Sequence, residues 1–347
     1  MLRIGDIELD FPVIQAALSG YSDAPMRTIA RRHGAPFCMH EVVLDKLVVQ
    51  PGRIQRRLLR LDPSDHPIGG QIMGAEPEQF ARAAALLVDA GYDTIDLNFG
   101  CPVRKVLGRC RGGFLLSQPQ TAVEIVRRVR DTVPREIPVT VKMRRGMDSD
   151  DESERDFFHI LDAAFESGVA AVTVHGRTVK QRYEGKSDWG FLARVKRHVG
   201  DRTVLGSGDL FTAEDIRRML AETGVDGVAV ARGCIGNPWI FEEAQAALDN
   251  QPLPAPPSVA TQGRVIHEHY SHCARIYGEK RAAIVMRKFG IKYAELHPEH
   301  LAVRDAFVAV KKTTDWLAAL QRWYDPARDW PPGRRRVGPS ELMNEVA

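Results

Sequence analysis

Eight short β-rich segments recur along the first 233 residues, and their spacing restricts the possible folds more than any other feature of the chain. Their starts lie 24 to 44 residues apart, which is the length of one strand followed by one helix. Several are apolar at nearly every position, as parallel strands buried on both faces are. Eight such units predict a (β/α)₈ barrel over residues 1–250. The segments span residues 12–18, 37–43, 67–74, 94–100, 138–144, 171–177, 203–209 and 227–233.

The remainder of the chain predicts a second, helical domain. A doubly wound open sheet is the alternative for the first part, but no G-x-G-x-x-G follows the first segment. Four prolines fall between residues 251 and 258, which predicts a semi-rigid linker over 251–260. Amphipathic patterns at 265–276, 282–294 and 301–324 predict a small three-helix bundle over 261–330. Residues 331–347 form a basic tail that we expect to be flexible.

Composition and charge narrow the possible function classes. The chain has no apolar run near the length of a membrane span and no signal-peptide pattern, so we expect a cytoplasmic protein without membrane contact. Five widely spaced cysteines without a C-x-x-C pair argue against disulfides and against a metal site. Residues 251–347 carry 15 Lys and Arg against 10 Asp and Glu. This excess suits a domain that faces nucleic acid, although many solvated surfaces are equally basic.

Polar residues gather where the predicted strands end, which is the catalytic face of such barrels. The glycine-containing turns after the seventh and eighth strands would grip a phosphate through backbone N–H groups. A sugar phosphate, pyridoxal phosphate and flavin mononucleotide all fit this logic. Lys142 could form a Schiff base, or it could balance the charge of a reduced flavin. The strand-end residues are 17–20, Glu41, Gln71, Asn98, Cys101, Lys142, Arg144, His175, Arg177, 207–209 and 231–233.

Five motifs in order on these strands resemble those of the tRNA-dihydrouridine synthases. They are Asp96-Leu-Asn-Phe-Gly-Cys-Pro-Val-Arg-Lys-Val106, Val174-His-Gly-Arg-Thr178 with Gln181-Arg-Tyr and Asp188-Trp, Gly208-Asp-Leu, and Arg232-Gly-Cys-Ile-Gly-Asn-Pro-Trp239. The resemblance runs from about residue 11 to residue 330. It implies a flavin-binding barrel with a C-terminal helical domain, in agreement with the strand count.

The resemblance also implies a reaction. Members reduce the C5=C6 bond of particular uridines in tRNA with FMN and, as a rule, NADPH, NADH being the alternative donor. Hydride passes from the reduced flavin to C6, and an acid protonates C5. The resemblance assigns that acid to Cys101, whose thiol must stay protonated to act. Without the motif, Cys101 reads as one small buried residue among others. Cys110 has basic neighbours but no counterpart in the family.

Further roles follow from the same resemblance. Gln71, Lys142 and His175 would contact the flavin, with Lys142 near N1 and O2. The remaining cofactor contacts would come from Ala17, Leu18, Ser19, Ser207, Gly208, Asp209, Ala231 and Arg232. Three positions depart from the family pattern: Ala17 replaces a proline, Ser207 an asparagine and Ala231 a glycine. Alanine is tolerated at 231 only if the backbone there needs no positive φ.

We expect tRNA to be the partner of a monomeric enzyme. The predicted substrate contacts are Asn98, Arg144, Arg177, Arg104, Lys105, Arg287 and Lys288. Two other function classes compete with this hypothesis. A small-molecule FMN oxidoreductase on the same barrel would need no basic helical domain. A non-catalytic RNA-binding protein would need neither Cys101 nor Lys142.

Overall fold

The computed structural model describes residues 1–338, which fold into two compact units. The first comprises residues 1–22, 35–210 and 216–231, and the second comprises 23–34, 211–215 and 232 onward. The first unit therefore ends at Ala231, before the predicted boundary at 250. Helix α1 (Ala24–Arg32) belongs to the second unit although it follows the first barrel strand in sequence. Residues 339–347, the end of the predicted tail, lie outside the described residues.

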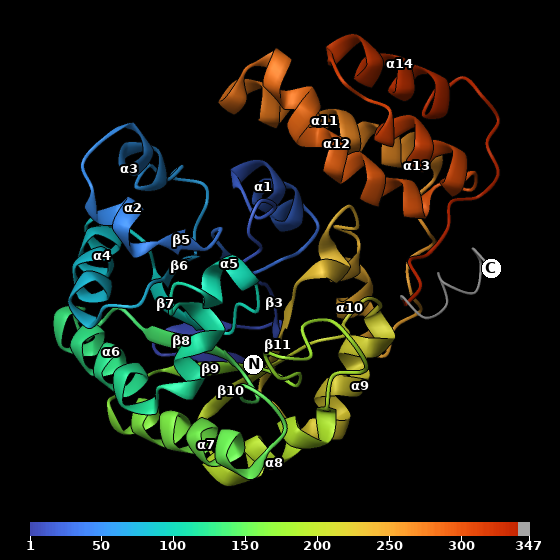
Figure 1. Cartoon of the computed structure of the whole chain (residues 1–347). Coiled ribbons are helices and arrows are strands. Elements are labelled where there is room, and N and C mark those ends of the chain that lie inside the picture. Colours follow the sequence, from blue (N-terminus) through green and yellow to red (C-terminus); the bar gives the residue numbers. More distant parts are fainter. Residues whose placement is uncertain (339–347) are drawn as a thin grey trace. The chain divides into compact units, whose positions relative to one another are not determined.

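A closed ring of parallel strands forms the first unit, as the eight segments predicted (Figure 1). Each strand pairs with its sequence neighbours, and the last strand pairs with the first to close the barrel. The strands of the ring are β3 (Val13–Gln15), β4 (Cys38–Met39), β6 (Ile68–Met73), β7 (Thr94–Phe99), β8 (Val139–Arg144), β9 (Ala171–His175), β10 (Thr203–Ser207) and β11 (Gly227–Val230).

Helices follow most of the strands. Among residues 1–338, no helix is both long enough and apolar enough to cross a membrane. The helices between the strands are α2 (Asp45–Val49), α3 (Arg53–Leu58), α4 (Pro77–Asp89), α5 (Arg104–Leu107), α6 (Pro119–Thr132), α7 (Asp151–Glu166), α8 (Trp189–Val199) and α9 (Ala213–Thr223). Short 3₁₀ turns add η1 (Gly112–Ser117) and η2 (Arg232–Cys234).

The second predicted strand, 37–43, is split into two short pieces. β4 pairs with the beginning of β6, where Cys38 lies opposite Ile68. β5 (Val43–Leu44) pairs with the end of β6, where Val43 lies opposite Ile72. Between the two pieces, His40 still donates its backbone N–H to the carbonyl of Gly69 in β6, and residues 41–42 leave the ladder. The polar residues His40 and Glu41 in that gap explain why a continuous β-run was the wrong expectation.

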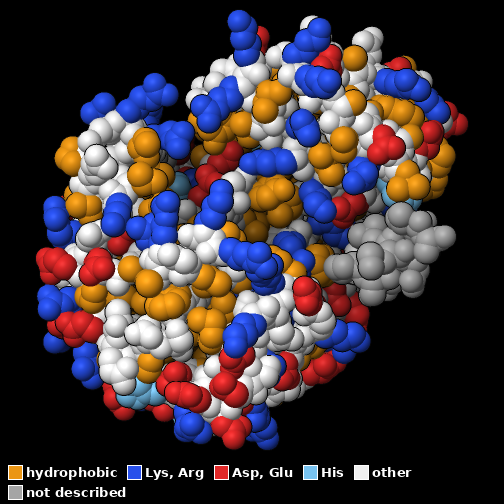
Figure 2. All heavy atoms as spheres, viewed as in Figure 1, with side chains coloured by type: hydrophobic (Ala, Val, Ile, Leu, Met, Phe, Trp, Pro, Cys, Tyr) orange, Lys and Arg blue, Asp and Glu red, His pale blue; other side chains and the backbone are white. Residues whose placement is uncertain are grey.

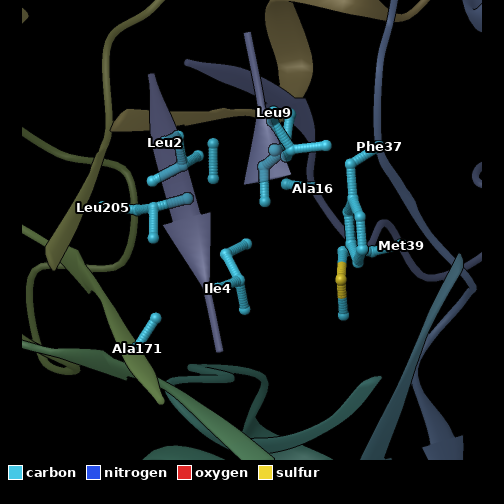
Figure 3. Packing of buried hydrophobic residues seen from close by; sticks show 10 residues of the cluster. Leu2, Ile4, Leu9, Ala16, Phe37, Met39, Ala171 and Leu205 are labelled. Atoms are coloured by element: carbon cyan, nitrogen blue, oxygen red, sulfur yellow. The ribbon is translucent and has the colours of Figure 1, made fainter. Parts of the chain in front are cut away.

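An N-terminal hairpin that we did not predict contributes to the barrel interior. β1 (Leu2–Ile4) and β2 (Ile7–Leu9) pair antiparallel. Figure 3 shows Leu2, Ile4 and Leu9 packed with side chains from the barrel strands, and all of them are buried. Burying such side chains contributes roughly 1.5–3 kcal/mol each. The partners in this cluster are Ile14, Ala16, Phe37, Met39, Ala171, Leu205 and Ala229.

After the proline segment the second unit has four α-helices, where we predicted three. Besides α1, its helices are α10 (Ile240–Leu248), α11 (Val259–Tyr277), α12 (Glu279–Tyr293), η3 (Ala294–Leu296), α13 (His300–Val308) and α14 (Thr313–Trp323). The predicted helix 301–324 is broken because the Asp315 carboxylate accepts the backbone N–H groups of Lys311 and Lys312, which starts a new helix there. The proline segment has no regular structure up to Ser258, whose hydroxyl caps α11.

Part of the tail that we expected to be flexible is held in place. Arg336 is buried, and its guanidinium donates to the carbonyl of Gly233 and pairs with Glu295 at 2.6 Å. Arg335 forms an ion pair with Glu243, and Arg334 donates its backbone N–H to the carbonyl of Leu296. The basic run is therefore fixed by contacts inside the second unit, because its charges find carboxylates and carbonyls there.

Candidate active site

The strand register stacks polar residues in three layers inside the barrel. Gln71 lies opposite Asp96, and Asp96 lies opposite Thr140. Toward the ends of the strands, Asn98 pairs with Lys142, and Lys142 pairs with Thr173. At the outermost positions His175 lies between Arg144 and Ser207. Because alternate residues of a strand point to the same face, these side chains share the barrel interior.

A chain of buried hydrogen bonds connects the inner layer to the Cys101 loop. Thr140 donates to Asp96 at 2.6 Å, and Gln71 donates to the other carboxylate oxygen at 2.7 Å. The amide of Asn98 then donates to Gln71 Oε1 at 2.7 Å. Burial raises the pKa of Asp96, while these hydrogen bonds and the charge of Lys142 act in the opposite direction. The network fixes both amide groups by using most of their donors and acceptors.

Asn98 positions the loop that carries Cys101. Its side-chain oxygen accepts the backbone N–H groups of Gly100 at 3.0 Å and Cys101 at 3.1 Å. The carbonyl of Cys101 accepts the N–H of Gly113, which closes the loop on its far side. Gly112 has a left-handed φ of 57°, and a Cβ there would lie 2.8 Å from Cys101 Cβ. Only glycine allows so close an approach beside the thiol.

The Cys101 thiol is partly buried and stays protonated at neutral pH. Burial raises its pKa above the ordinary value for cysteine, and the N–H of Val103 and the charge of Arg144 oppose that effect only in part. Cys110, the rival thiol, is exposed on the same loop. A neutral thiol is a proton donor, whereas a thiolate is a nucleophile. The environment of Cys101 therefore suits general acid catalysis.

Lys142 supplies a positive charge without a partner. Its ammonium makes no hydrogen bond or ion pair with the other residues of the described chain. Its surroundings inside the barrel lower its pKa to about 8, mainly through desolvation and then through the charge of Arg144. It lines a cavity together with Ala16, Ala17, Gln71, Asp96 and Thr173. A desolvated cation beside a cavity is stabilised by any anion that binds there.

Arg144 and Arg177, two of the predicted substrate contacts, hold backbone loops. Both are buried. Arg144 donates to the carbonyls of Gly100, Thr178 and Arg182, at 2.6 to 3.0 Å. Its guanidinium also lies 5.5 Å from the ring centroid of Tyr183. A guanidinium that is already satisfied by carbonyls has little capacity left for RNA, so positioning is the role that this geometry favours.

Arg177 organises the turn after β10. It forms a bidentate ion pair with Asp209, with both distances at 2.8 Å, and donates to the carbonyl of Gly185. Asp209, whose φ of 59° is left-handed, also accepts the N–H of Ser187 at 2.8 Å. A Cβ at Gly208 would lie 2.4 Å from Ser187 Oγ, so the turn has room only for glycine. Its backbone is therefore rigid and closely packed before any ligand binds.

The other predicted cofactor residues lie at neighbouring strand ends. Ala17 lines the cavity, while Leu18 begins a turn that closes through the hydroxyl of Ser22. Ser19 is exposed in that turn. Ser207 is buried and donates to the carbonyl of Ala229 across to the next strand. Ala231 has no positive φ. The backbone there accommodates alanine, as is required at a position where the family usually has glycine.

The predicted RNA contacts lie on exposed helices. Arg104 and Lys105 are exposed on α5, three and four residues after Cys101, and their side chains make no hydrogen bond or ion pair within the described chain. Arg287 is exposed on α12 in the second unit, and Lys288 beside it lies 5.3 Å from the ring centroid of Phe289. In the same unit Arg232 lies over the ring of Phe211 at 5.1 Å.

Three further side chains position the loops in roles that the sequence did not assign, although Glu41 was predicted to lie at a strand end. Glu41 accepts the N–H of Gly20 at 2.6 Å and thereby holds the first loop. Ser187 and Trp189 brace the turn at Gly208 and Asp209, the indole by donating to the carbonyl of Gly208. Trp189 could have been found from the sequence because it belongs to the Asp188-Trp motif, whereas no motif includes Ser187. Among residues 1–338, no group of three or more His, Cys, Asp or Glu side chains could hold a metal ion.

Comparisons with known proteins point to one family. A family model described as dihydrouridine synthase (Dus) matches residues 14–327. A protein of Mycobacterium tuberculosis (strain CDC 1551 / Oshkosh) named probable tRNA-dihydrouridine synthase is 36% identical over 330 residues, covering 92% of this chain and 83% of the relative. A Rickettsia conorii protein with the same name is 34% identical over 325 residues, covering 93% and 95%. The tRNA-dihydrouridine synthase B of Pasteurella multocida is 29% identical, covering 93% and 96%.

Solved structures support the fold. An old yellow enzyme homologue from Zymomonas mobilis matches with a TM-score of 0.53 and 15% identity, over 73% of this chain and 92% of that chain. Morphinone reductase in complex with tetrahydroNAD matches with a TM-score of 0.53 and 14% identity, over 74% and 91%. At such low identity these likenesses bear on the barrel architecture and not on the substrate.

Proposed function

This chain belongs to the dihydrouridine synthase family, and on that basis we propose that it reduces the C5=C6 bond of uridines in tRNA. The observation that carries the proposal is the neutral Cys101 thiol, held at the barrel mouth by Asn98 and Arg144. Reduction of an activated double bond requires a proton donor at the carbon that develops negative charge. Cys101 is the group in this site that can donate such a proton.

Cys101 acts in this proposal as the acid at C5. Its S–H proton passes to C5 as that carbon gains electron density, which leaves a thiolate. The positive charge of Arg144 favours the thiolate, and water restores the proton before the next turnover. Asn98 acts through the loop and is a positioning residue, because its oxygen is already occupied by the N–H groups of Gly100 and Cys101.

FMN is the cofactor that these residues fit. Two observations support the fit: the ammonium of Lys142 makes no hydrogen bond or ion pair within the described chain, and the turn at Gly208 has room only for glycine. Lys142 and Gln71 would contact the ring system, Ala17 and His175 would flank it, and the turns at Ser207–Asp209 and Ala231–Arg232 would hold the ribityl phosphate. When bound, the flavin supplies the two electrons of the reduction. We propose NADPH as their source, with NADH as the alternative.

Two exposed basic regions would contact the tRNA. Arg104 and Lys105 follow the catalytic cysteine by three and four residues, so they would meet phosphates beside the target uridine. Arg287 and Lys288 on α12 would contact the backbone elsewhere. Reaching a base in folded RNA requires it to leave its stack, and backbone contacts on either side stabilise that state.

Nucleoside analysis by mass spectrometry tests the proposal. tRNA that lacks dihydrouridine is incubated with the protein, FMN and NADPH, in parallel with Cys101→Ala and the exposed control Cys110→Ala. We expect dihydrouridine from the wild type and from Cys110→Ala, and at least a hundredfold less from Cys101→Ala. Wild-type protein that retains FMN but forms no dihydrouridine would contradict the proposal and favour a small-molecule flavin reductase.

A further inference from the structure

Helix α3 carries a cluster of arginines that neither the fold nor the proposed catalytic site uses. Arg53, Arg56 and Arg57 lie on the helix and Arg60 follows its end, and all four side chains are exposed. The spacing of three, four and seven residues places them on one face. Within the described chain, none of the four guanidinium groups makes a hydrogen bond or an ion pair. We call these four residues the α3 arginine cluster.

The cluster destabilises the helix that carries it. Like charges three and four residues apart on a helix raise its free energy by about 0.2–0.5 kcal/mol per pair. Several exposed arginines elsewhere in the same unit have acidic partners, as Arg3 pairs with Glu8, Arg128 with Glu124 and Arg194 with Glu154, at 2.6 to 3.2 Å. The α3 arginine cluster differs from these paired arginines: the charge of Arg60 acts on Asp62, but none of the four guanidinium groups is in an ion pair within the described chain, so an external anion would relieve their repulsion.

The helix is nevertheless attached firmly to the barrel unit. It has no buried residue of its own. Gln55 donates its side-chain amide to the carbonyl of Val48 in α2 at 2.7 Å, and the hydroxyl of Tyr92 donates to the carbonyl of Leu58 at 3.0 Å. These two bonds hold α3 at both ends of its short length. The arginines thus project from a fixed support, which reduces the entropy lost when they bind.

Contacts through α2 connect this support to the catalytic loop. α2 begins at Asp45, whose carboxylate is buried against Gly74 at the end of β6. The charge of Arg111, in the loop that carries Cys101, acts on Asp45 and opposes the rise in pKa that burial causes there. Figure 1 shows α2 and α3 adjacent at the edge of the barrel, and Figure 2 shows blue side chains gathered over α3 in the same view.

We propose that the α3 arginine cluster binds phosphates of the tRNA backbone, away from the uridine that is reduced. The inference rests on the proposed function, since it assigns a second contact to the same substrate. A polyanion with regularly spaced phosphates matches several guanidinium groups at once. A membrane would require an apolar helix face, and α3 exposes only Ile54. A protein interface would require an apolar or aromatic centre, which the cluster lacks.

Two variants with equal loss of charge test the proposal. Arg53→Gln/Arg56→Gln/Arg57→Gln removes three charges from the cluster. Arg3→Gln/Arg128→Gln/Arg194→Gln removes three charges that are ion-paired. Affinity for tRNA is measured by filter binding at several salt concentrations, and KM and kcat are measured by dihydrouridine formation. Thermal unfolding and flavin content show whether each variant is folded.

We expect the cluster variant to bind tRNA about 10- to 100-fold more weakly at low salt. The slope of log affinity against log salt should fall by about 2, since each phosphate contact contributes about 0.7–0.9. KM should rise while kcat at saturating tRNA stays within twofold, and the control variant should change each quantity less than twofold. If the cluster variant does not fold, Arg56→Gln compared with Arg194→Gln gives the same test, with an expected slope change near 1.

Three results would overturn the inference. Equal weakening in both variants would mean that net charge alone acts. An unchanged salt slope in the cluster variant would mean that no phosphate is bound there. Loss of binding to phosphatidylglycerol vesicles with unchanged affinity for tRNA would assign the cluster to a membrane. Failure of the proposed function has a different signature, because wild-type protein would then form no dihydrouridine at all.

Discussion

The arginines at the ends of the barrel strands and those on α3 have opposite surroundings. Arg144 and Arg177 are buried, and their guanidinium groups are occupied by backbone carbonyls and by Asp209. Arg53, Arg56 and Arg57 are exposed and have no partner within the described chain. An arginine inside a catalytic motif can therefore be a support for loops, whereas an arginine outside any motif can be available to a ligand. Stability should depend on the first kind and binding on the second.

Arg177→Met should have the largest effect on stability. It leaves Asp209 without its bidentate partner and leaves the carbonyl of Gly185 without a donor. Breaking a buried charge pair on one side costs about 3–5 kcal/mol. We expect the midpoint of urea unfolding to fall accordingly, while Arg53→Met changes the free energy of unfolding by less than about 0.5 kcal/mol. Equal midpoints for Arg177→Met and the wild type would contradict the distinction between the two kinds of arginine.

Asn98→Ala should lower kcat more than it lowers cofactor affinity. The substitution removes the acceptor for the N–H groups of Gly100 and Cys101, so the thiol loses its fixed position. We expect kcat to fall about 100-fold, which corresponds to about 2.7 kcal/mol. Asn98→Asp keeps the acceptor and should retain more activity. Stopped-flow measurement of tRNA reduction, with flavin content determined in parallel, checks this split, and an equal loss in both variants would argue against positioning through the acceptor.

The second unit offers a parallel case in Arg336. Its guanidinium donates to the carbonyls of Arg232 and Gly233, in the turn that we propose for the cofactor phosphate. We expect Arg336→Met to weaken FMN binding about tenfold, or about 1.4 kcal/mol, as measured by flavin fluorescence titration. Arg335→Met is the matched control, because Arg335 binds Glu243 and Pro254 instead. If Arg335→Met binds FMN as weakly as Arg336→Met does, the tail is loosened in general and Arg336 does not support the turn specifically.

Much of the barrel could be predicted because its signal is local and repeated. Each of the eight segments contains a strand of the ring, since their apolar runs and spacing suit parallel pairing. The hairpin of β1 and β2 was missed because two three-residue strands have too little periodicity to detect, and their stability comes from distant partners such as Phe37 and Ala171. The break between α13 and α14 depends on one carboxylate, Asp315, within an otherwise continuous amphipathic pattern.

Positions within the site were easier to predict than roles. Strand-end logic placed Asn98 and Lys142 on neighbouring strands, and the structure pairs them there. The sequence does not reveal whether a guanidinium at such a position reaches outward or inward, because that depends on which carbonyls the loops present. Arg144 finds those of Thr178 and Arg182, more than thirty residues away in sequence. The assignments to cofactor and RNA stay predictions.

The smallest expected effect concerns Lys142 and provides a test by pH. Its pKa is lowered from 10.5 to about 8 in the folded protein, mainly by desolvation. Between these two values the unfolded chain binds more protons than the folded one, so stability should rise as pH increases from 8 to 10.5. After allowance for partial exposure, we expect a gain of about 1 kcal/mol in the free energy of unfolding of the flavin-free protein.

The variant Lys142→Met lacks the titrating group and should lack this gain. The difference between the pH profiles of the variant and the wild type therefore separates Lys142 from cysteines and tyrosines that titrate in the same range. Superimposable profiles would mean that Lys142 is solvated and balanced already, and would remove the main reason to place an anionic cofactor beside it. FMN should reduce the difference by raising the pKa of the ammonium that it contacts.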